Sequence, residues 1–327
     1  MKNLAIIGSG ISGIVLASLL KKKYNITIFE KARGVGGRLS TRRQEGFSFD
    51  HGAQYFTMRS KEMLNFCKPC IDSGSLVSWS PRYVEFDDNN NYIEKLDDEI
   101  RYVGYPYMNS FLKELIDIND IKFNTEITAV KKNNKWDLID QHKNCFSGFD
   151  YVVFAMPAVQ AALLSPANVI FYDKIKSIKM NPCFALMLGF DEFFDVGFDA
   201  GFDAASFTNS KLSWLALNSS KPGRVRKNTI VAHSTVEYAS LNLLKHYSDI
   251  IHDLSYEIDQ ITDIKTDKAI FQNLHLWRYS ISDLECNAKY FYDDKLNVYA
   301  CGDWCYGNRV EGAFLSAYYL AEKLGNL

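Results

Sequence analysis

The feature that most constrains the fold is a glycine-rich turn near the start of the chain. Gly8-Ser9-Gly10-Ile11-Ser12-Gly13 follows a short apolar run, residues 4–7, and opens an apolar helical pattern over residues 14–20. A second β-branched run, residues 25–29, ends at Glu30. This spacing predicts a strand–turn–helix–strand unit, the first part of an α/β domain with a parallel sheet.

The glycines of this unit have separate predicted roles. Gly8 permits a tight turn, Gly10 lets the backbone approach a pyrophosphate, and Gly13 allows the helix to pack closely on the strand. The helix N-terminus offers free N–H groups to an anion, and Glu30 stands where a carboxylate accepts hydrogen bonds from ribose hydroxyls. We therefore predict a dinucleotide site that includes Gly8, Gly10, Ile11, Ser12, Gly13, Glu30 and Lys31.

Two further segments narrow the choice of dinucleotide, which the turn alone leaves open between NAD and FAD. Gly34-Val35-Gly36-Gly37-Arg38 follows the acid, and Arg38 can offer a guanidinium fork to phosphate oxygens. Near the other end of the chain, Gly302-Asp303 follows an apolar run, and Arg309-Val310-Glu311-Gly312-Ala313 opens a second helical pattern. With these motifs the chain resembles the flavin-containing amine oxidase superfamily.

That resemblance implies FAD, which we expect to be bound noncovalently. It places Asp303 at the ribityl chain, Val130 beside the adenine, and the start of the helix near Glu311 at the N1/O2 edge of the flavin. A helix N-terminus there favours the negative charge of the reduced flavin. The cofactor contacts that the resemblance adds are Gly37, Arg38, Val130, Gly302, Asp303, Arg309, Val310, Glu311 and Ala313.

Further stretches are similar to one branch of that superfamily, the renalase-like oxidoreductases. They are Phe49–Phe56, Pro182–Leu188, Trp277–Tyr279, Gly302–Cys305 and Arg309–Phe314. The branch has a Rossmann-like FAD-binding domain of the glutathione reductase/amine oxidase type and an inserted mixed α/β substrate domain. Its activity is the oxidation of 2-dihydro and 6-dihydro isomers of NAD(P)H. Hydride passes to flavin N5, and O2 then reoxidises the flavin to give hydrogen peroxide.

The resemblance also implies a domain division that interrupts the FAD-binding domain twice. We predict that residues 1–57, 119–165 and 285–327 form this domain, and that residues 58–118 and 166–284 form the substrate domain. Tyr107 is a departure, because the branch usually carries Gly in that position. If its loop borders the active site, Tyr107 narrows the pocket and shifts the substrate preference.

The predicted catalytic residues are Trp277, Arg278, Tyr279 and His51. Aromatic walls hold a flat heterocycle, and an arginine can meet a phosphate or a carboxamide. Trp and Tyr in a strand are more often core residues, and the catalytic interpretation depends mainly on the resemblance, so both interpretations stay open here. His51 and His275 are candidates near the site, although a single histidine more often has a structural role.

Composition limits the remaining function classes. The chain has 327 residues and a net charge of −2, which gives no sign of the basic face that nucleic acids require. No apolar run approaches the ~20 residues of a membrane span, and the first residues lack a signal-peptide pattern, so we expect a cytoplasmic protein.

The chain has seven cysteines, which we predict to be reduced thiols. Cys67 and Cys70 form a CxxC, a pattern found in redox pairs and as half of a zinc site. No second CxxC or histidine pair completes a metal site, so we predict no metal and prefer a structural role for this pair.

Three functions follow in order of preference. The first is the oxidase of dihydronicotinamide isomers, with O2 as electron acceptor and a small-molecule substrate. The second is a flavin amine oxidase that acts on a small amine, and the third is a noncatalytic flavoprotein redox sensor. No Ser/His/Asp or paired-carboxylate pattern of a hydrolase is present, which agrees with hydride chemistry carried by a cofactor.

Overall fold

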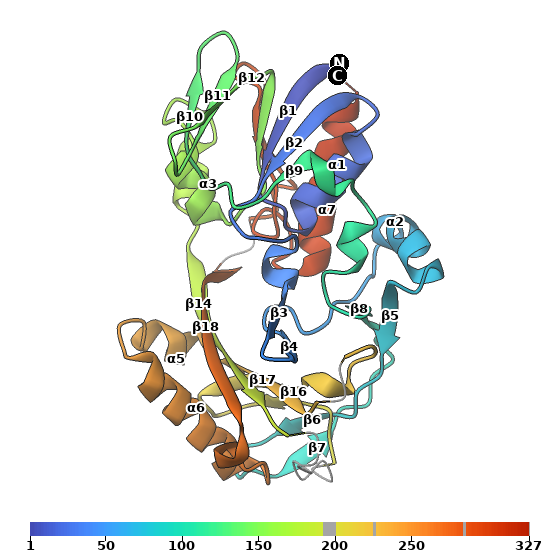
Figure 1. The fold of residues 1–327 in the computed structure, drawn as a ribbon, viewed down its shortest axis with the longest axis vertical. Helices are drawn as coiled ribbons and strands as arrows, with labels where there is room; N and C mark the ends of the chain where they lie inside the picture. Colours follow the sequence, from blue (N-terminus) through green and yellow to red (C-terminus); the bar gives the residue numbers. More distant parts are fainter. Residues whose placement is uncertain (192–200, 225–226, 284–285, 327) are drawn as a thin grey trace.

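The computed structural model describes residues 1–191, 201–224, 227–283 and 286–326. Two lobes meet at a narrow waist, and both chain ends lie at the outer end of the upper lobe (Figure 1). A six-stranded sheet forms the centre of the upper lobe and a seven-stranded sheet that of the lower lobe. The chain crosses the waist several times, so each lobe is built from segments far apart in the sequence.

The six-stranded sheet has the order β19-β20-β13-β1-β2-β9. All neighbours are parallel except β19 and β20, which are antiparallel. Leu4 to Ile7 of β1 are buried, because a central parallel strand is covered on both faces. The strands are β1 (Lys2–Ile7), β2 (Tyr24–Phe29), β9 (Ile121–Lys122), β13 (Tyr151–Phe154), β19 (Phe291–Asp293) and β20 (Val298–Ala300).

Two helices from opposite ends of the chain pack together on one face of this sheet. They are α1 (Ile11–Leu20) and α7 (Val310–Gly325). The Ser12 hydroxyl donates to the carbonyl of Ala313 at 2.8 Å, and the Tyr24 hydroxyl donates to the carbonyl of Leu324 at 2.9 Å. These contacts fasten the last helix to the first strand–helix unit.

The other face of the sheet is covered by a smaller sheet and two short helices. Phe29, Trp136 and Phe154 belong to the buried cluster between them. The covering elements are β10 (Ile127–Lys132), β11 (Trp136–Asp140), β12 (Cys145–Phe149), α3 (Ala158–Leu164) and α4 (Tyr172–Lys176).

The lower lobe is a seven-stranded sheet of order β18-β14-β17-β16-β15-β6-β7, with two helices on its outer face. Only β15 and β6 are parallel among its described neighbours. The strands are β6 (Tyr83–Phe86), β7 (Tyr92–Glu94), β14 (Met180–Gly189), β15 (Ala204–Phe207), β16 (Leu212–Leu217), β17 (Thr229–Ser234) and β18 (Phe271–Ser282). The helices are α5 (Val236–Leu241) and α6 (Tyr247–Ile261).

The inner face of the seven-stranded sheet carries a hairpin at the waist, formed by β3 (Thr41–Gln44) and β4 (Phe47–Asp50). Phe47 and Phe49 of this hairpin pack against Met187, Val231 and Phe271 of the sheet. The hairpin therefore joins the glycine-rich segment of the upper lobe to the inner face of the lower lobe (Figure 1).

Elements of the segment 58–118 pack in both lobes. Helix α2 (Lys61–Asp72) and the strand pair β5 (Leu76–Trp79) and β8 (Arg101–Gly104) contribute to the same buried cluster as α1 and α7, whereas β6 and β7 join the lower sheet. The predicted domain boundaries stay a prediction.

The two cysteines of the CxxC, Cys67 and Cys70, lie buried on α2 as free thiols. Burial raises the pKa of the Cys67 thiol to about 12.

The described residues contain neither a membrane-spanning helix nor a metal-binding cluster. None of their helices is long and apolar enough to cross a membrane. The same residues contain no group of three or more His, Cys, Asp or Glu side chains that could hold a metal ion.

Candidate cofactor and substrate cavity

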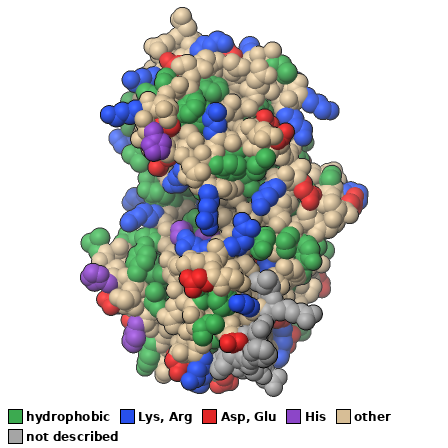
Figure 2. All heavy atoms as spheres, viewed as in Figure 1, with side chains coloured by type: hydrophobic (Ala, Val, Ile, Leu, Met, Phe, Trp, Pro, Cys, Tyr) green, Lys and Arg blue, Asp and Glu red, His purple; other side chains and the backbone are tan. Residues whose placement is uncertain are grey.

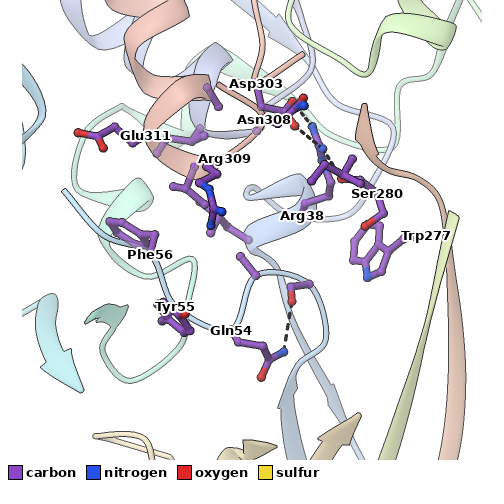
Figure 3. Close-up of a pocket in the computed structure, with 18 of the residues that line it drawn as sticks. Arg38, Gln54, Tyr55, Phe56, Trp277, Ser280, Asp303, Asn308, Arg309 and Glu311 are labelled. Carbon is purple, nitrogen blue, oxygen red and sulfur yellow. Dashed lines mark hydrogen bonds and ion pairs between the residues drawn. The ribbon is translucent and has the colours of Figure 1, made fainter. Parts of the chain in front are cut away.

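A cavity of about 590 Å³ lies at the waist between the two lobes, within the range of roughly 300–1,000 Å³ of ligand pockets. Both ends of the chain contribute to its wall, as do the seven-stranded sheet and the loops that follow strands of the six-stranded sheet (Figure 3). The predicted site residues that line it are Gly10, Ile11, Ser12, Arg38, Trp277, Gly302, Asp303, Arg309, Val310, Glu311 and Ala313. The others, Gly8, Gly13, Glu30, Lys31, Gly37, His51, Val130, Arg278 and Tyr279, are outside this lining.

The three glycines of the first turn have different surroundings. A Cβ at Gly13 would lie 2.0 Å from the carbonyl oxygen of Gly8, and a Cβ at Gly8, where φ is +106°, would lie 2.8 Å from that of Ala155. A Cβ at Gly10 would meet nothing within 4 Å. Gly8 and Gly13 thus serve backbone packing, whereas Gly10 keeps space open at the cavity wall.

Two helices begin at this wall. Neither the start of α1 nor that of α7 has a side-chain cap, and the first turn of α1 contains no acidic residue. The first backbone N–H groups of a helix lack partners within the helix, and its dipole is positive there, so such ends bind anions. An open cradle at Gly10 with uncapped helix starts fits the pyrophosphate of a dinucleotide such as FAD.

Glu30 lies at the end of β2, turned back toward the glycine-rich turn. Its carboxylate accepts hydrogen bonds from the backbone N–H and the hydroxyl of Ser9, at 2.9 and 2.7 Å, and from the N–H of Ala32 at 2.8 Å. Both bonds from Ser9 go to Oε2, so Oε1, which accepts only from Ala32, keeps a further lone pair for a ribose hydroxyl. Lys31 is exposed, and Val130 is buried in the same cluster as Phe29.

Arg38 and Asp303 bind each other. The guanidinium donates two hydrogen bonds to the carboxylate, at 2.7 and 2.5 Å, and a third to the carbonyl of Ser280 at 2.6 Å (Figure 3). The sequence predicted separate contacts, with phosphate for Arg38 and the ribityl chain for Asp303. The structure brings both groups to one place on the cavity wall, where β18 of the lower lobe meets the upper lobe.

Glu311 has a structural partner at the start of α2. One carboxylate oxygen accepts hydrogen bonds from the N–H and hydroxyl of Ser60, at 2.6 and 2.7 Å, and from the N–H of Arg59 at 2.8 Å. The side chain therefore points away from Arg38 and Asp303 (Figure 3). A contact between Glu311 and a cofactor in the cavity would use its backbone N–H rather than its carboxylate.

On the substrate side, Trp277 lines the cavity together with Tyr55 and Trp214. The indole N–H of Trp277 donates to the carbonyl of His51 at 2.8 Å, which holds the ring in place. Arg278 is exposed, since strand alternation directs it to the face opposite Trp277. Tyr107 is not among the residues that line the cavity.

Three histidines lie at this wall: His233 lines the cavity, and His51 and His275 lie outside the lining. Burial, with the nearby charge of Arg42 and the ring of His275, lowers the pKa of His51 to about 3. Burial likewise lowers the pKa values of His233 and His275 to about 4. At neutral pH these rings are therefore uncharged, and they offer no cation to a bound substrate.

A buried charge cluster that the sequence did not predict supports the same wall. Arg224 donates to Asp50 at 2.6 and 3.1 Å, and Lys221 lies 3.3 Å from the same carboxylate; all three side chains are buried. Burial opposes ionisation of Asp50, but the two cations more than offset it and lower its pKa. Burial lowers the pKa of Lys221 to about 8. Lys221 also donates to Gln54, a residue of the cavity wall, at 3.0 Å.

Sequence reasoning missed this cluster because its members carry no local signal. Asp50 and Gln54 belong to a stretch that was recognised only by resemblance, and Lys221-Pro222-Gly223-Arg224 has the composition of an ordinary turn. Only the pairing of the hairpin with the lower sheet brings Asp50 to Lys221 and Arg224.

Comparison with known proteins gives local matches in sequence. The model of an NAD(P)-binding Rossmann-like domain matches residues 6–69. The 4,4'-diapolycopen-4-al dehydrogenase of Metabacillus indicus is 32% identical over 93 residues, 27% of this chain and 19% of that protein. The 1-hydroxycarotenoid 3,4-desaturase of a Flavobacterium species is 46% identical over 59 residues, 18% of this chain and 12% of that protein. The chain thus spans less than a fifth of either relative.

Solved structures match over almost the whole chain. A putative protoporphyrinogen oxidase from Exiguobacterium has a TM-score of 0.77 at 11% identity and covers 99% of this chain and 98% of its own. Putrescine oxidase bound to putrescine has a TM-score of 0.74 at 10% identity, with 100% and 99% covered. With the sheet order described above, these matches confirm the predicted fold class, an α/β chain with a Rossmann-like dinucleotide-binding domain of the amine oxidase type and a second, mixed α/β lobe.

Proposed function

We propose that this chain is a FAD-dependent oxidoreductase. One observation carries the proposal: a single cavity has a glycine cradle and two uncapped helix starts at one end and an aromatic wall at the other. The first end suits a dinucleotide cofactor, and the second suits a flat substrate. FAD would supply the two-electron chemistry, taking hydride from the substrate and passing electrons to O2.

The residues that would hold FAD follow from the cavity wall. Gly10 and the N–H groups at the starts of α1 and α7 would bind the pyrophosphate and the flavin edge, and Glu30 would accept from the adenosine ribose. Arg38 and Asp303, now paired with each other, are placed to contact polar groups of the cofactor. We expect noncovalent binding, because burial raises the pKa of the Cys305 thiol well above its ordinary value and a thiolate is the reactive form.

We propose 2-dihydro or 6-dihydro NAD(P) isomers as the substrate class. Trp277 and Trp214 offer flat faces to a nicotinamide ring. The histidines His51 and His233 are uncharged, so they would orient the ring and exclude water rather than transfer a proton. Orientation and desolvation are the main contributions that a protein makes to hydride transfer.

The charges of the wall fit this class better than a small amine. A carboxylate free to pair with it would favour a cationic amine. The wall carboxylates of the described residues are all committed: Asp303 binds Arg38, Glu99 pairs with Arg59, and Glu311 binds the start of α2. Arg309 also lines the cavity, and no carboxylate among the described residues forms an ion pair with it.

The test is an anaerobic mixing experiment with the purified yellow protein. We expect 6-dihydro-NAD to bleach the flavin absorbance rapidly, and air to restore it with one equivalent of hydrogen peroxide. Ordinary 4-dihydro-NAD and putrescine serve as comparison reductants. Bleaching by putrescine alone would replace the proposal with an amine oxidase, and a protein without flavin absorbance would remove the cofactor assignment.

A further inference from the structure

A partly buried arginine on the hairpin at the waist has no carboxylate partner. The guanidinium of Arg42 contacts the side-chain oxygen of Asn273 at 3.5 Å and the Nδ1 of His275 at 3.3 Å, both neutral acceptors. Among the described residues, no Asp or Glu forms an ion pair with Arg42. A cation that is desolvated without a counterion is costly unless an anion binds beside it.

A second cation makes this position still less favourable without an anion. Burial, followed by the nearby positive charge of Arg33, lowers the pKa of Arg42. Lys and Arg side chains gather around the hollowed waist between the lobes (Figure 2). A guanidinium without a carboxylate partner can bind a phosphate group through its fork of N–H donors.

The arginine adjoins the wall of the cavity. The rings of His275 and Trp277 are 4.3 Å apart, and both residues lie on the same face of β18, as the alternation of a strand requires. Trp277 lines the cavity. Arg42 therefore contacts the aromatic wall through His275, which packs against Trp277, while Arg42 and His275 themselves lie outside the cavity lining.

We propose that Arg42 binds a phosphate group of the substrate and so selects phosphate-bearing dihydronicotinamides over phosphate-free ones. This inference rests on the proposed function for the identity of the ring. The phosphate site itself depends only on the contacts of Arg42. Neutral His275 orients the guanidinium by accepting its hydrogen bond and adds no charge of its own.

The test compares Arg42→Gln with Arg43→Gln. Arg43 is the next residue of the same strand, but its guanidinium lies 5.0 Å from the centre of the Tyr107 ring, so it serves as a matched control for the loss of one charge. For 6-dihydro-NAD, we expect Arg42→Gln to raise KM roughly ten- to a hundredfold, with kcat nearly unchanged. For the phosphate-free 6-dihydronicotinamide riboside, KM should change less than about twofold, and Arg43→Gln should leave both values alone.

A binding measurement separates this inference from the proposed function. ADP-ribose is titrated calorimetrically into the FAD-loaded protein, so that the cofactor site is already filled, and inorganic pyrophosphate is used in a parallel titration. We expect both to bind, and Arg42→Gln to lose at least about tenfold in affinity while Arg42→Lys recovers part of it. If 6-dihydro-NAD fails to bleach the flavin but this binding pattern holds, only the proposed redox substrate is wrong. Absence of binding to the wild-type protein, or equal losses in Arg42→Gln and Arg43→Gln, would overturn the phosphate site.

Discussion

The two ends of the cavity are built in different ways. The cofactor end consists of one short stretch, Gly8 to Gly13, and the start of α7, where glycines and helix geometry place backbone N–H groups. The substrate end depends on side chains from distant segments, such as Asp50, Lys221 and Trp277. A backbone site tolerates changes of side chain except at its glycines, whereas a side-chain site depends on a buried network. Substitutions at the two ends should therefore differ in their effects on stability and on ligand binding.

The largest expected effect is the loss of the buried carboxylate. Asp50→Asn leaves Lys221 and Arg224 buried without a counter-charge, which should reduce the free energy of unfolding by ~3–5 kcal/mol. Asp72→Asn is the control, because its pair with Lys68 is exposed and is worth less than ~1 kcal/mol. Urea unfolding measures both. Equal shifts in the two variants would mean that the buried cluster does not stabilise the substrate end.

Two glycine substitutions separate packing from cofactor binding. Gly13→Ala places a Cβ 2.0 Å from the Gly8 carbonyl, and this overpacking should cost about 1–3 kcal/mol with or without FAD. Gly10→Ala meets no protein atom within 4 Å, so the apoprotein should keep its stability while FAD binds at least about tenfold more weakly. Thermal unfolding of the apoprotein and FAD titration provide the two readouts. A Gly10→Ala apoprotein as unstable as Gly13→Ala would contradict the open cradle.

At the substrate end, Trp277→Phe removes the hydrogen bond from the indole to the His51 carbonyl. We expect kcat/KM for 6-dihydro-NAD to fall about tenfold, while the flavin spectrum stays unchanged. Arg278→Gln is the neighbouring comparison, since Arg278 is exposed on the other face of β18 and should have little effect. Stopped-flow flavin reduction measures both variants. A larger loss in Arg278→Gln would restore the catalytic role that the sequence assigned to Arg278.

A further expected effect is a pH dependence of stability. The pKa of His51 is about 3 in the folded protein and about 6.5 when unfolded. As pH falls below about 6.5, the unfolded chain takes up a proton that the folded chain refuses, so stability decreases by up to ~1.4 kcal/mol per pH unit from this group. His233 and His275 act in the same direction.

Urea unfolding between pH 5 and pH 8 measures this slope, and His51→Gln should make it shallower. His252→Gln, at an exposed position of α6, should leave the slope unchanged. A stability that does not change over this range would show that the three rings titrate normally.

The sequence alone predicted the local structure of the proposed cofactor end. Gly8, Gly10, Gly13 and Glu30 are close together in the chain, and their roles depend on local backbone geometry, so spacing and residue type were sufficient to predict the turn and the helix. The Gly302-Asp303 motif and the start of α7 were also recognisable, although their meeting with α1 needed a hydrogen bond across 301 positions. The family resemblance predicted that these two segments meet, whereas the periodicity of the sequence gives no information on contacts between distant segments.

Only the tertiary structure decided the substrate end. Nothing local distinguishes Lys221 or Arg224 from surface residues of a turn, and Arg42 stands beside Arg43 in a segment that looks uniformly exposed. Their environments arise when the hairpin packs on the lower sheet. This packing buries Asp50 with the two cations Lys221 and Arg224, and the alternation of a strand separates Arg42 from Arg43. Burial and charge pairing depend on contacts between distant segments, and the order of residues along the chain does not contain that information in any local form.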